Sequence, residues 1–375
     1  MNVLVTGGAG FIGVHLVRRL LSEGCSVAIL DNFSPQVHGD NQNLPSDLAG
    51  LVELYRSDVR DSSAVSRALT NRDVVVHLAA ETGTGQSMYQ ISRYQDVNIG
   101  GTAAILDVLS NCPGIRCSKV VLASSRAVYG EGKYSCTEHG FVYPGARSAE
   151  DLRAGRYEPA CPRCGESCAP QATTEDSPLS PLSFYGLTKK VQEEMLFMFA
   201  HGRNFSACAL RFQNVYGPGQ SLRNPYTGIL AIFSNLARSN SAIQIFEDGQ
   251  ESRDFIFIDD VVEATWRCLT QDVGDVDSFN VGTGRRIAVL DVAKEVVRYF
   301  GADAEILVTG AFRQGDIRHN FADVVRIEAK TGFAPKIPFS EGLARFLDWA
   351  ATQNEVPSQY ESSLREMSDR GLLHE

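Results

Sequence analysis

The sequence lacks any apolar run near the roughly 18 residues needed to cross a bilayer, and it has no excess of positive charge. Its 35 Lys and Arg residues are outnumbered by 45 Asp and Glu residues, which gives a formal net charge of −10. A membrane span and a nucleic-acid partner are both disfavoured, because nucleic acid requires a positive surface. The N-terminus has the pattern of a core strand and not of a signal peptide, so we expect a cytoplasmic protein.

Internal repeats and low-complexity segments are also absent. With 375 residues, 43% hydrophobic and 21% charged, the composition is that of a globular protein with one large core or two lobes. The nine cysteines are an odd number, and in a reducing compartment they do not indicate disulfides. Five are scattered and are expected to be small apolar side chains, namely Cys25, Cys112, Cys117, Cys208 and Cys268. The other four lie between residues 136 and 168.

A glycine-rich turn stands in VLVTGGAGFIG, from Val3 to Gly13. An apolar run ends at Gly7, Gly10 and Gly13, and helical periodicity begins at Phe11 and Ile12. Glycine lets the backbone of such a turn approach a pyrophosphate, and the N-terminus of the following helix presents free N–H groups to it. The turn therefore predicts a dinucleotide site.

Asp31 ends the next apolar run, near the position of the acidic residue that binds the adenosine ribose in dinucleotide-binding folds. Its carboxylate would repel a 2′-phosphate. Asn32 and Phe33 follow it, with no arginine there to bind such a phosphate. The pattern predicts NAD as the cofactor in preference to NADP.

Strand-like apolar runs alternate with helical periodicity in the first part of the chain. This alternation predicts a Rossmann-type doubly wound parallel sheet of the α/β class, with helices on both faces. We expect strands at Val3–Thr6, Val27–Leu30, Val52–Ser57, Val74–Leu78, Val120–Ser124 and Ser206–Arg211, and helices at Phe11–Ser22, Ser62–Leu69, Tyr94–Leu109 and Ser183–Ala200. Ligands bind beyond the carboxyl ends of such strands, where HLAAETGTG (77–85) and SSRAVYGEG (124–132) fall.

The pattern changes at about residue 215. We expect residues 1–215 to form the NAD-binding domain. Residues 216–351 are expected to form mainly a smaller substrate lobe, with a helix that Pro225 opens and that runs to about residue 239. The polar residues 352–375 are expected to be an exposed tail. Residues 131–176 interrupt the α/β pattern, because they have no sustained apolar period. So long a segment without regular structure needs something that ties it down.

Tyr185 and Lys189 lie four residues apart on a predicted helix and share one face of it. A phenol with a pKa of about 10 is a poor base at neutral pH, and we expect the Lys189 ammonium to lower that pKa. Ser125 follows a predicted strand, which places its hydroxyl at the same sheet edge. There it can donate to a substrate oxygen and pass its proton to Tyr185. These three residues are the candidate catalytic residues.

Together, TGGAGFIG, Asp31, SSRAVYG, Tyr185 with Lys189, LRFQNVYGPG and RDFIFIDDVV resemble the extended short-chain dehydrogenase/reductase family of nucleotide-sugar epimerases and dehydratases. The resemblance covers about residues 1–351, apart from the interrupted segment. It implies a bound NAD, a dTDP- or UDP-hexose substrate and a homodimer. It also implies that Tyr185 is the catalytic acid or base, with Ser125 as its hydroxyl partner, and that Lys189 holds the nicotinamide ribose.

The same resemblance implies further contacts. Those to the cofactor are Asn32, Asp58, Val59, Leu78, Ala79 and Ala80, and those to the substrate are Ser125, Arg126, Asn214, Arg253 and Asp316. An alternative for Arg253 is an ion pair with neighbouring Asp254. An alternative for Arg313, Asp316 and Arg318 is a solvated charge cluster.

The residues after Ser125 bear on the reaction. In the 4,6-dehydratases that the sequence resembles, Asp and Glu follow the catalytic hydroxyl residue, whereas here Arg126 and Ala127 do. Neither can protonate a leaving hydroxyl, so C4 epimerisation through a transient ketone is favoured. The sequence resembles most the branch that interconverts dTDP-L-rhamnose and dTDP-6-deoxy-L-talose. The alternatives are a 4,6-dehydratase, a 4-ketoreductase, or a non-catalytic NAD-binding protein with a zinc interaction module.

Residues 131–176 carry two paired ligand motifs, Cys136-x-x-His139 and Cys161-x-x-Cys164, each followed by glycine. Two such turns about 20 residues apart match the spacing of a zinc ribbon. A tetrahedral site made of four protein ligands leaves no open position, so the predicted zinc is structural. Cys168 is an alternative to His139 as the fourth ligand. Because the segment lies between Ser125 and Tyr185 in sequence, we expect it to brace the rim of the sugar pocket.

Overall fold

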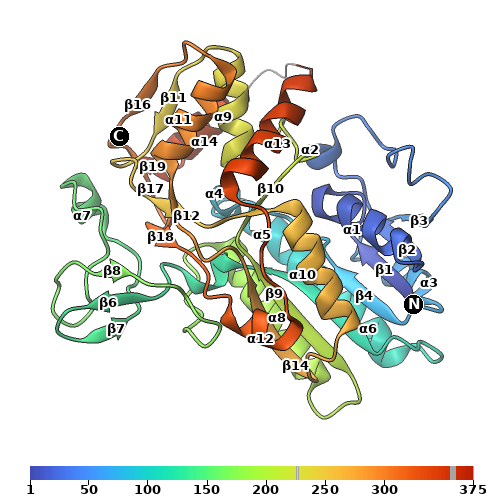
Figure 1. The fold of residues 1–375 in the computed structure, drawn as a ribbon. Coiled ribbons are helices and arrows are strands. Elements are labelled where there is room, and N and C mark those ends of the chain that lie inside the picture. The colour runs from blue at the N-terminus through green and yellow to red at the C-terminus, as the bar shows by residue number, and fades with distance from the viewer. Residues whose placement is uncertain (225, 227, 355–359, 375) are drawn as a thin grey trace.

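The computed structural model describes residues 1–224, 226, 228–354 and 360–374. A seven-stranded sheet lies at the centre, in the order β14-β9-β5-β4-β1-β2-β3, with neighbouring strands parallel (Figure 1). The strands are β1 (Asn2–Thr6), β2 (Ser26–Asp31), β3 (Glu53–Arg56), β4 (Val74–His77), β5 (Lys119–Ser125), β9 (Ser206–Phe212) and β14 (Val276–Val281). The order reverses between β1 and β4, and ligands bind beyond the carboxyl ends of strands at such a point. The predicted Rossmann-type α/β fold is confirmed.

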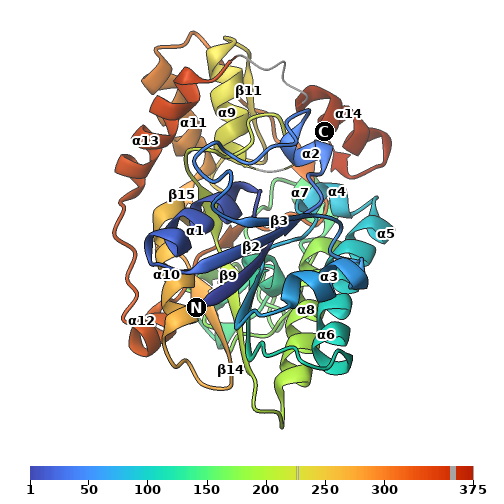
Figure 2. The same cartoon turned by 90° about the vertical axis from the view of Figure 1, so that its right-hand side faces the viewer.

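Helices cover both faces of this sheet (Figure 2). One face carries α1 (Phe11–Ser22) and α10 (Ile258–Thr270), and the other carries α3 (Ser62–Leu69), α6 (Gly101–Asn111) and α8 (Phe184–Ala200). Side chains of a strand alternate between faces, so Val3 and Val5 belong to one apolar core and Leu4 belongs to the other. Burial on both faces explains why the strand sequences are almost continuously apolar.

The helix predicted over 94–109 begins earlier and changes its winding. It consists of α5 (Ile91–Tyr94), a π-helical turn η1 (Gln95–Gly100) and α6. The wider turn carries the buried Asn98, whose amide donates to the Glu81 carbonyl at 3.1 Å and to the Thr188 hydroxyl at 2.9 Å. Asn98 thereby ties the loop after β4 to α8.

A second lobe lies over the carboxyl edge of the sheet. Its larger elements are α9 (Ile229–Arg238), β11 (Ile243–Ile245), α11 (Val289–Phe300), β16 (Ile306–Val308) and α13 (Phe339–Thr352). Short connecting elements are β10 (Asn214–Tyr216), β12 (Ser252–Arg253), β13 (Phe255–Phe257), β15 (Ile287–Ala288), β17 (Phe312–Arg313), β18 (His319–Asn320) and α12 (Val325–Thr331). The predicted helix start at residue 225 lies outside the described residues. No described helix is long and apolar enough to cross a membrane.

Two features of the C-terminal half differ from the sequence prediction. The chain returns to the central sheet with α10 and β14, so β14 is a strand that periodicity did not reveal. The segment expected to be an exposed tail instead forms α14 (Tyr360–Asp369) and β19 (Leu373–His374), and β19 pairs with β17. That expectation was wrong for these residues, because Tyr360, Leu364 and Met367 recur at helical spacing and are buried.

Residues 131–176, which we call the insert, contain more regular structure than the sequence predicts. A small antiparallel sheet comprises β6 (Tyr134–Cys136), β7 (Gly140–Val142) and β8 (Ala169–Pro170), and a short helix α7 (Ala149–Arg153) follows β7. Tyr134 and Val142 pack with the cysteines into a small core. In Figure 1 the insert projects beside the second lobe.

His77 connects the elements around the switch point. The ring lies at the end of β4, with Nδ1 2.8 Å from the Thr6 hydroxyl and Nε2 3.1 Å from the Thr102 hydroxyl. Gln192 of α8 donates to the same Thr102 oxygen at 2.7 Å. Burial, together with the positive charge of Lys189, lowers the pKa of His77 to about 3. The ring is therefore neutral in the folded protein at physiological pH.

This burial predicts an acid sensitivity of stability. Because the folded-state pKa is below the unfolded value, His77 contributes its full stability above about pH 6.5 and loses it as pH falls towards 3. Urea unfolding should show a loss of up to about 1.4 kcal/mol per pH unit from this group. In a His77→Gln variant the free energy of unfolding should depend less steeply on pH, because this group no longer titrates. Equal slopes for the two proteins between pH 6 and pH 4.5 would contradict the assignment.

Candidate functional site

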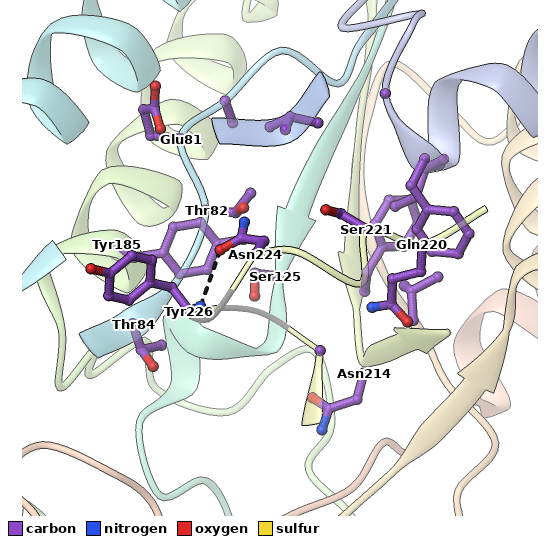
Figure 3. Close-up of a pocket in the computed structure, with 18 of the residues that line it drawn as sticks. Glu81, Thr82, Thr84, Ser125, Tyr185, Asn214, Gln220, Ser221, Asn224 and Tyr226 are labelled. Carbon is purple, nitrogen blue, oxygen red and sulfur yellow. Dashed lines mark hydrogen bonds between the residues drawn. The ribbon is translucent and has the colours of Figure 1, made fainter. Parts of the chain in front are cut away.

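A cavity of about 540 Å³ lies at the carboxyl ends of β1, β4 and β5, between the sheet and the second lobe. Residues of both parts line it, and Figure 3 shows Ser125, Tyr185 and Asn214 around the same space. The structure brings every predicted cofactor and substrate residue to this cavity. These are Gly7, Gly10, Phe11, Ile12, Gly13, Asp31, Asn32, Asp58, Val59, Leu78, Ala79, Ala80, Ser125, Arg126, Tyr185, Lys189, Asn214, Arg253 and Asp316.

The glycine turn is as tight as the sequence predicts. Gly7 has a φ of +69°, and a Cβ on it would lie 2.7 Å from the backbone nitrogen of Ala79. A Cβ on Gly13 would lie 2.4 Å from the Gly7 carbonyl oxygen. Side chains at these positions would separate α1 from the turn and fill the space where the backbone faces the cavity. This cradle fits a pyrophosphate at the N-terminus of α1.

Asp31 lies at the end of β2 beside this turn. One carboxylate oxygen accepts the Phe33 N–H at 2.8 Å and the other accepts the Ala9 N–H at 3.0 Å. A carboxylate accepts about four hydrogen bonds, so capacity remains for ribose hydroxyls. The amide of Asn32, the next residue, donates to Asp58 at 3.0 Å. These residues fit the adenosine half of NAD.

The N-terminus of α8 approaches β5 closely. Ser183 caps the helix by accepting the Gly186 N–H at 3.1 Å. A Cβ on Gly186 would lie 2.4 Å from the carbonyl oxygen of Ala127, in the short 3₁₀ helix η2 (Arg126–Tyr129) that follows Ser125. Glycine at this position therefore allows the contact that brings Tyr185 next to Ser125. Gly186 directly follows Tyr185 in the sequence, but the spacing of Tyr185 and Lys189 does not by itself indicate that a glycine is needed between them.

Burial has a large effect on the pKa values of both Tyr185 and Lys189. Burial raises the pKa of Tyr185, although a hydrogen bond with Ser125 and the charge of Arg126 both lower it. Lys189 is only 2% exposed, and burial lowers its pKa to about 7. Its amine donates to the Ala123 carbonyl at 2.8 Å. Burial thus opposes the expected lowering of the Tyr185 pKa, and Ser125 and Arg126 supply the contributions that lower it in this structure.

A cluster of charges lies on the second-lobe side of the cavity. Asp316 pairs with Arg253 at 3.1 Å and with Arg313 at 2.6 Å. Burial would raise the pKa of Asp316, but the charges of Arg313, Arg253 and Arg126, together with that of Arg147, hold it well below the usual range. The cluster retains a positive excess when Asp316 is ionised, so it suits an anionic ligand.

The contacts bear on both alternatives left open for these charges. Arg253 does not pair with its neighbour Asp254, whose oxygens accept from the Thr283 and Gly284 backbone. Arg318 is 1% exposed and is not part of a solvated cluster. Its guanidinium pairs with acidic residues behind the cavity wall.

Sequence reasoning missed several lining residues in loops and in the C-terminal segment. They are Gln220, Ser221, Asn224, Tyr226, Phe246, Tyr360 and Met367, several of which are labelled in Figure 3. Thr82 and Thr84 also line the cavity, and they belong to the segment 77–85 that was expected at this edge. The hydroxyls of Tyr226 and Tyr89 donate to Glu366 of α14 at 2.8 and 3.0 Å. No local pattern identifies these residues, because tertiary contacts alone bring α14 to the cavity.

The structure also brings the predicted metal ligands together. The ligand atoms of Cys136, His139, Cys161 and Cys164 all lie within 4.8 Å of one another. The Cys136 sulfur is 3.6 Å from both the Cys164 sulfur and Nδ1 of His139. Zinc–sulfur bonds of about 2.3 Å in a tetrahedron would separate ligands by roughly 3.7 Å, so the cluster fits zinc. Cys168 is outside the cluster, and its thiol lies 3.7 Å from the Glu166 carbonyl.

Comparisons with known proteins agree with this geometry. The model of the NAD dependent epimerase/dehydratase family matches residues 3–146 and 161–282. A dTDP-L-rhamnose 4-epimerase of Burkholderia thailandensis is 39% identical over 354 residues, which are 94% of this chain and 95% of that protein. A UDP-glucose 4-epimerase of Thermus thermophilus, solved in complex with NAD, superposes with a TM-score of 0.74 at 27% identity, covering 94% of this chain and 100% of that one.

A UDP-glucose 4-epimerase of Thermotoga maritima, solved with UDP-glucose, also has a TM-score of 0.74 at 28% identity. The superposition covers 93% of this chain and 98% of that one. The resemblance noted from the motifs is therefore confirmed over nearly the whole chain.

The position of Asp31 predicts the cofactor preference. Asp31→Ala should weaken NAD binding by about 1.5–3 kcal/mol, because it removes a charged hydrogen-bond acceptor. Binding of NADP should change less or improve, because repulsion of its 2′-phosphate is removed. Fluorescence titration of both dinucleotides measures the two effects. Asp47, an exposed partner of Arg18, provides the control Asp47→Ala. Equal weakening of both dinucleotides would contradict the assignment.

Proposed function

The chain belongs to the NAD dependent epimerase/dehydratase family, and from this premise we propose that it is an NAD-dependent nucleotide-sugar 4-epimerase that interconverts dTDP-L-rhamnose and dTDP-6-deoxy-L-talose. The observation that carries the proposal is one cavity lined by the glycine turn, by Ser125, Tyr185 and Lys189, and by an arginine cluster. These residues supply a cofactor site, a proton carrier and a site for the anionic part of the substrate within one cavity.

NAD fits the residues on the sheet side of the cavity. The turn at Gly7 and Gly13 would hold the pyrophosphate, Asp31 the adenosine ribose, and Lys189 the nicotinamide ribose. NAD bound there would supply the hydride acceptor for oxidation at C4 of the sugar and, once reduced, the hydride donor for the reverse step. Its positive charge adds to that of Arg126 in favouring the ionised form of Tyr185.

In this proposal Tyr185 carries the proton of the reaction. It accepts the proton of the C4 hydroxyl during oxidation and returns it to the C4 oxygen during reduction, so no second acid is required. Ser125 donates to the same oxygen and orients it. The Lys189 ammonium has three N–H donors, of which one binds the Ala123 carbonyl. Two remain for the ribose and for stabilising the Tyr185 phenolate.

The residues next to Ser125 favour epimerisation over elimination. Dehydration needs an acid for the leaving C6 hydroxyl and a base for the C5 proton. Arg126 provides neither, because its guanidinium stays protonated and its Nε donates to Asn214 at 3.1 Å. The Ala127 methyl group also provides neither. Reversible hydride transfer needs only Tyr185 and Ser125.

The sugar and base are proposed from the similarity to the Burkholderia thailandensis protein, which extends over 94% of this chain. The arginines Arg126, Arg253 and Arg313 line the cavity and would bind the diphosphate. We assign the second lobe, mainly residues 216–351 apart from β14 of the central sheet and α10 on its face, to the nucleotide sugar, and residues 1–215 to NAD.

We further propose that the Cys136, His139, Cys161 and Cys164 cluster holds a structural zinc ion. Four protein ligands complete a tetrahedron, so no position is open for substrate. The insert has only a small core of its own, and a metal cross-link would supply the missing stability.

A homodimer and a cytoplasmic location complete the proposal. The family resemblance suggests the dimer, and α8 exposes Leu187 and Met198 on its outer face. All nine cysteines are free thiols in the structure, which suits a reducing compartment. Sedimentation velocity tests the dimer directly.

The reaction can be tested with a panel of dTDP- and UDP-hexoses and no added cofactor, followed by NMR at C4. We expect inversion at C4 of dTDP-L-rhamnose, with the co-purified NAD conserved. A 4-keto-6-deoxy product would instead indicate a dehydratase. Stoichiometric consumption of reduced cofactor would indicate a ketoreductase. Bound NAD without turnover of any sugar would indicate a non-catalytic protein.

Removal of the Tyr185 hydroxyl should separate binding from chemistry. Tyr185→Phe should keep the bound dinucleotide and lower kcat roughly 10²–10⁴-fold, because the proton carrier is lost. Tyr299→Phe, a change at an exposed tyrosine of α11, is the matched control and should retain full activity. Persisting activity in Tyr185→Phe would refute the proposed chemistry.

The proposed metal site predicts how cysteine substitutions change the zinc content of the protein. Cys161→Ser should lose its zinc and loosen the insert before it affects NAD binding, because the insert lies outside the dinucleotide site. Cys168→Ala should keep its zinc, since Cys168 is outside the ligand cluster. Mass spectrometry of metal content in the purified variants decides the matter. Retention of one zinc ion by Cys161→Ser would count against the assignment.

A further inference from the structure

The insert docks on the second lobe through buried charges. Arg147 of the insert and Arg318 of the lobe have side chains only 4% and 2% exposed. Each pairs with carboxylates from the other part, because Arg147 binds Glu247 and Arg318 binds Glu158. Buried ion pairs of this kind are specific in geometry, since removing one partner leaves an uncompensated charge.

The Arg147 guanidinium uses all of its hydrogen-bonding capacity. Nε donates to Glu131 at 3.1 Å, and Nη1 donates to Glu247 at 2.9 Å and to the Tyr157 carbonyl at 3.0 Å. Nη2 lies 2.8 Å from Glu247 and donates to the Asp316 carbonyl at 3.1 Å. Arginine has five N–H donors in a fixed planar arrangement, and five contacts are present. Arg147 is therefore held in one orientation.

The partners of Arg147 adjoin the anion site of the cavity. Asp316 carries the side chain that pairs with Arg253 and Arg313. The Arg253 guanidinium also donates to the carbonyls of Ile317 and Arg318, at 2.8 and 2.9 Å. The Asp316 carbonyl thus contacts Arg147 outside the cavity, while the Asp316 side chain and the next two carbonyls contact Arg253.

Two further contacts fix the same wall. Glu131, at the start of the insert, accepts the Arg318 backbone N–H at 2.8 Å. Glu247 has a φ of +51°, which is unfavourable for a residue other than glycine, and it directly follows the lining residue Phe246. The ion pairs with Arg147 and Arg318 hold Glu247 there.

We propose that Arg147 is a positioning residue for the substrate diphosphate: it fixes residues 316–318 and Glu247 so that Asp316 holds Arg253 and Arg313 in their binding positions. Through Arg147 the insert sets the affinity of the cavity for a nucleoside diphosphate. The inference rests on the proposed function, because it assumes a nucleotide-sugar substrate. Arg147 and Glu158 both lie in 147–160, between the two segments that the family model matches.

The test uses Arg147→Lys, which keeps the buried positive charge but loses most of the contacts. Isothermal titration of UDP and of dTDP into the purified NAD-bound protein should show Kd raised roughly 10-fold or more. KM for the nucleotide sugar should rise in parallel, while kcat, bound NAD and zinc content stay at wild-type values. Arg156 of the same insert pairs with Asp151 at the surface, so Arg156→Lys is the matched control and should change nothing.

Unchanged Kd values in folded Arg147→Lys would overturn the inference, as would a lowered kcat with unchanged KM. Should Arg147→Lys fail to fold, Glu158→Gln gives the answer, because Glu158 is half-exposed and contacts Arg318 and His319 from the same insert. It should raise Kd in the same sense and by less, and an unchanged Kd would again be decisive against the inference. Wild-type protein that binds neither UDP nor dTDP would instead refute the proposed function.

Discussion

The close packing of α8 against the end of β5 is the constraint on which the site depends. Gly186, Lys189 and Glu193 share one face of α8, at spacings that suit a helix. Gly186 allows contact with the Ala127 carbonyl, the Lys189 amine binds the Ala123 carbonyl, and Glu193 accepts from Ser124 and pairs with Arg211 at 2.7 Å. Together the three contacts fix the position of α8 along β5, and in that position Tyr185 lies beside Ser125.

The parts predictable from the sequence were those that depend on local patterns. The glycine turn and Asp31 each combine residue type with position along a strand or helix, and both lie in the cavity as predicted. The candidate metal ligands were also predictable, because their spacing in two short motifs indicated which side chains would lie together. The walls from α14 were not predicted, because Tyr360 and Met367 lie in a polar segment and only tertiary contacts reveal their place. The effect of burial on the Tyr185 pKa was also not predictable, since burial depends on the complete fold.

The cavity shows how an acidic protein can bind an anion. The chain has a formal charge of −10, so its long-range field opposes a diphosphate. Arg126, Arg253 and Arg313 face the cavity with Asp316 as the nearest paired carboxylate. At these short distances the local excess of positive charge outweighs the distant negative charges, which solvent screens. Binding therefore relies on accurate placement of few side chains, and the insert contributes to that placement.

The path of the chain between its two parts restricts how they can move. The backbone leaves the sheet after β9, returns at α10 and β14, leaves again for α11, and returns once more at α12. A lobe joined by one linker can rotate about that linker alone, whereas a lobe joined by several crossings can rotate only if all of them bend together. Any rotation of the second lobe over the sheet would therefore have to change the backbone angles at each of these crossings together.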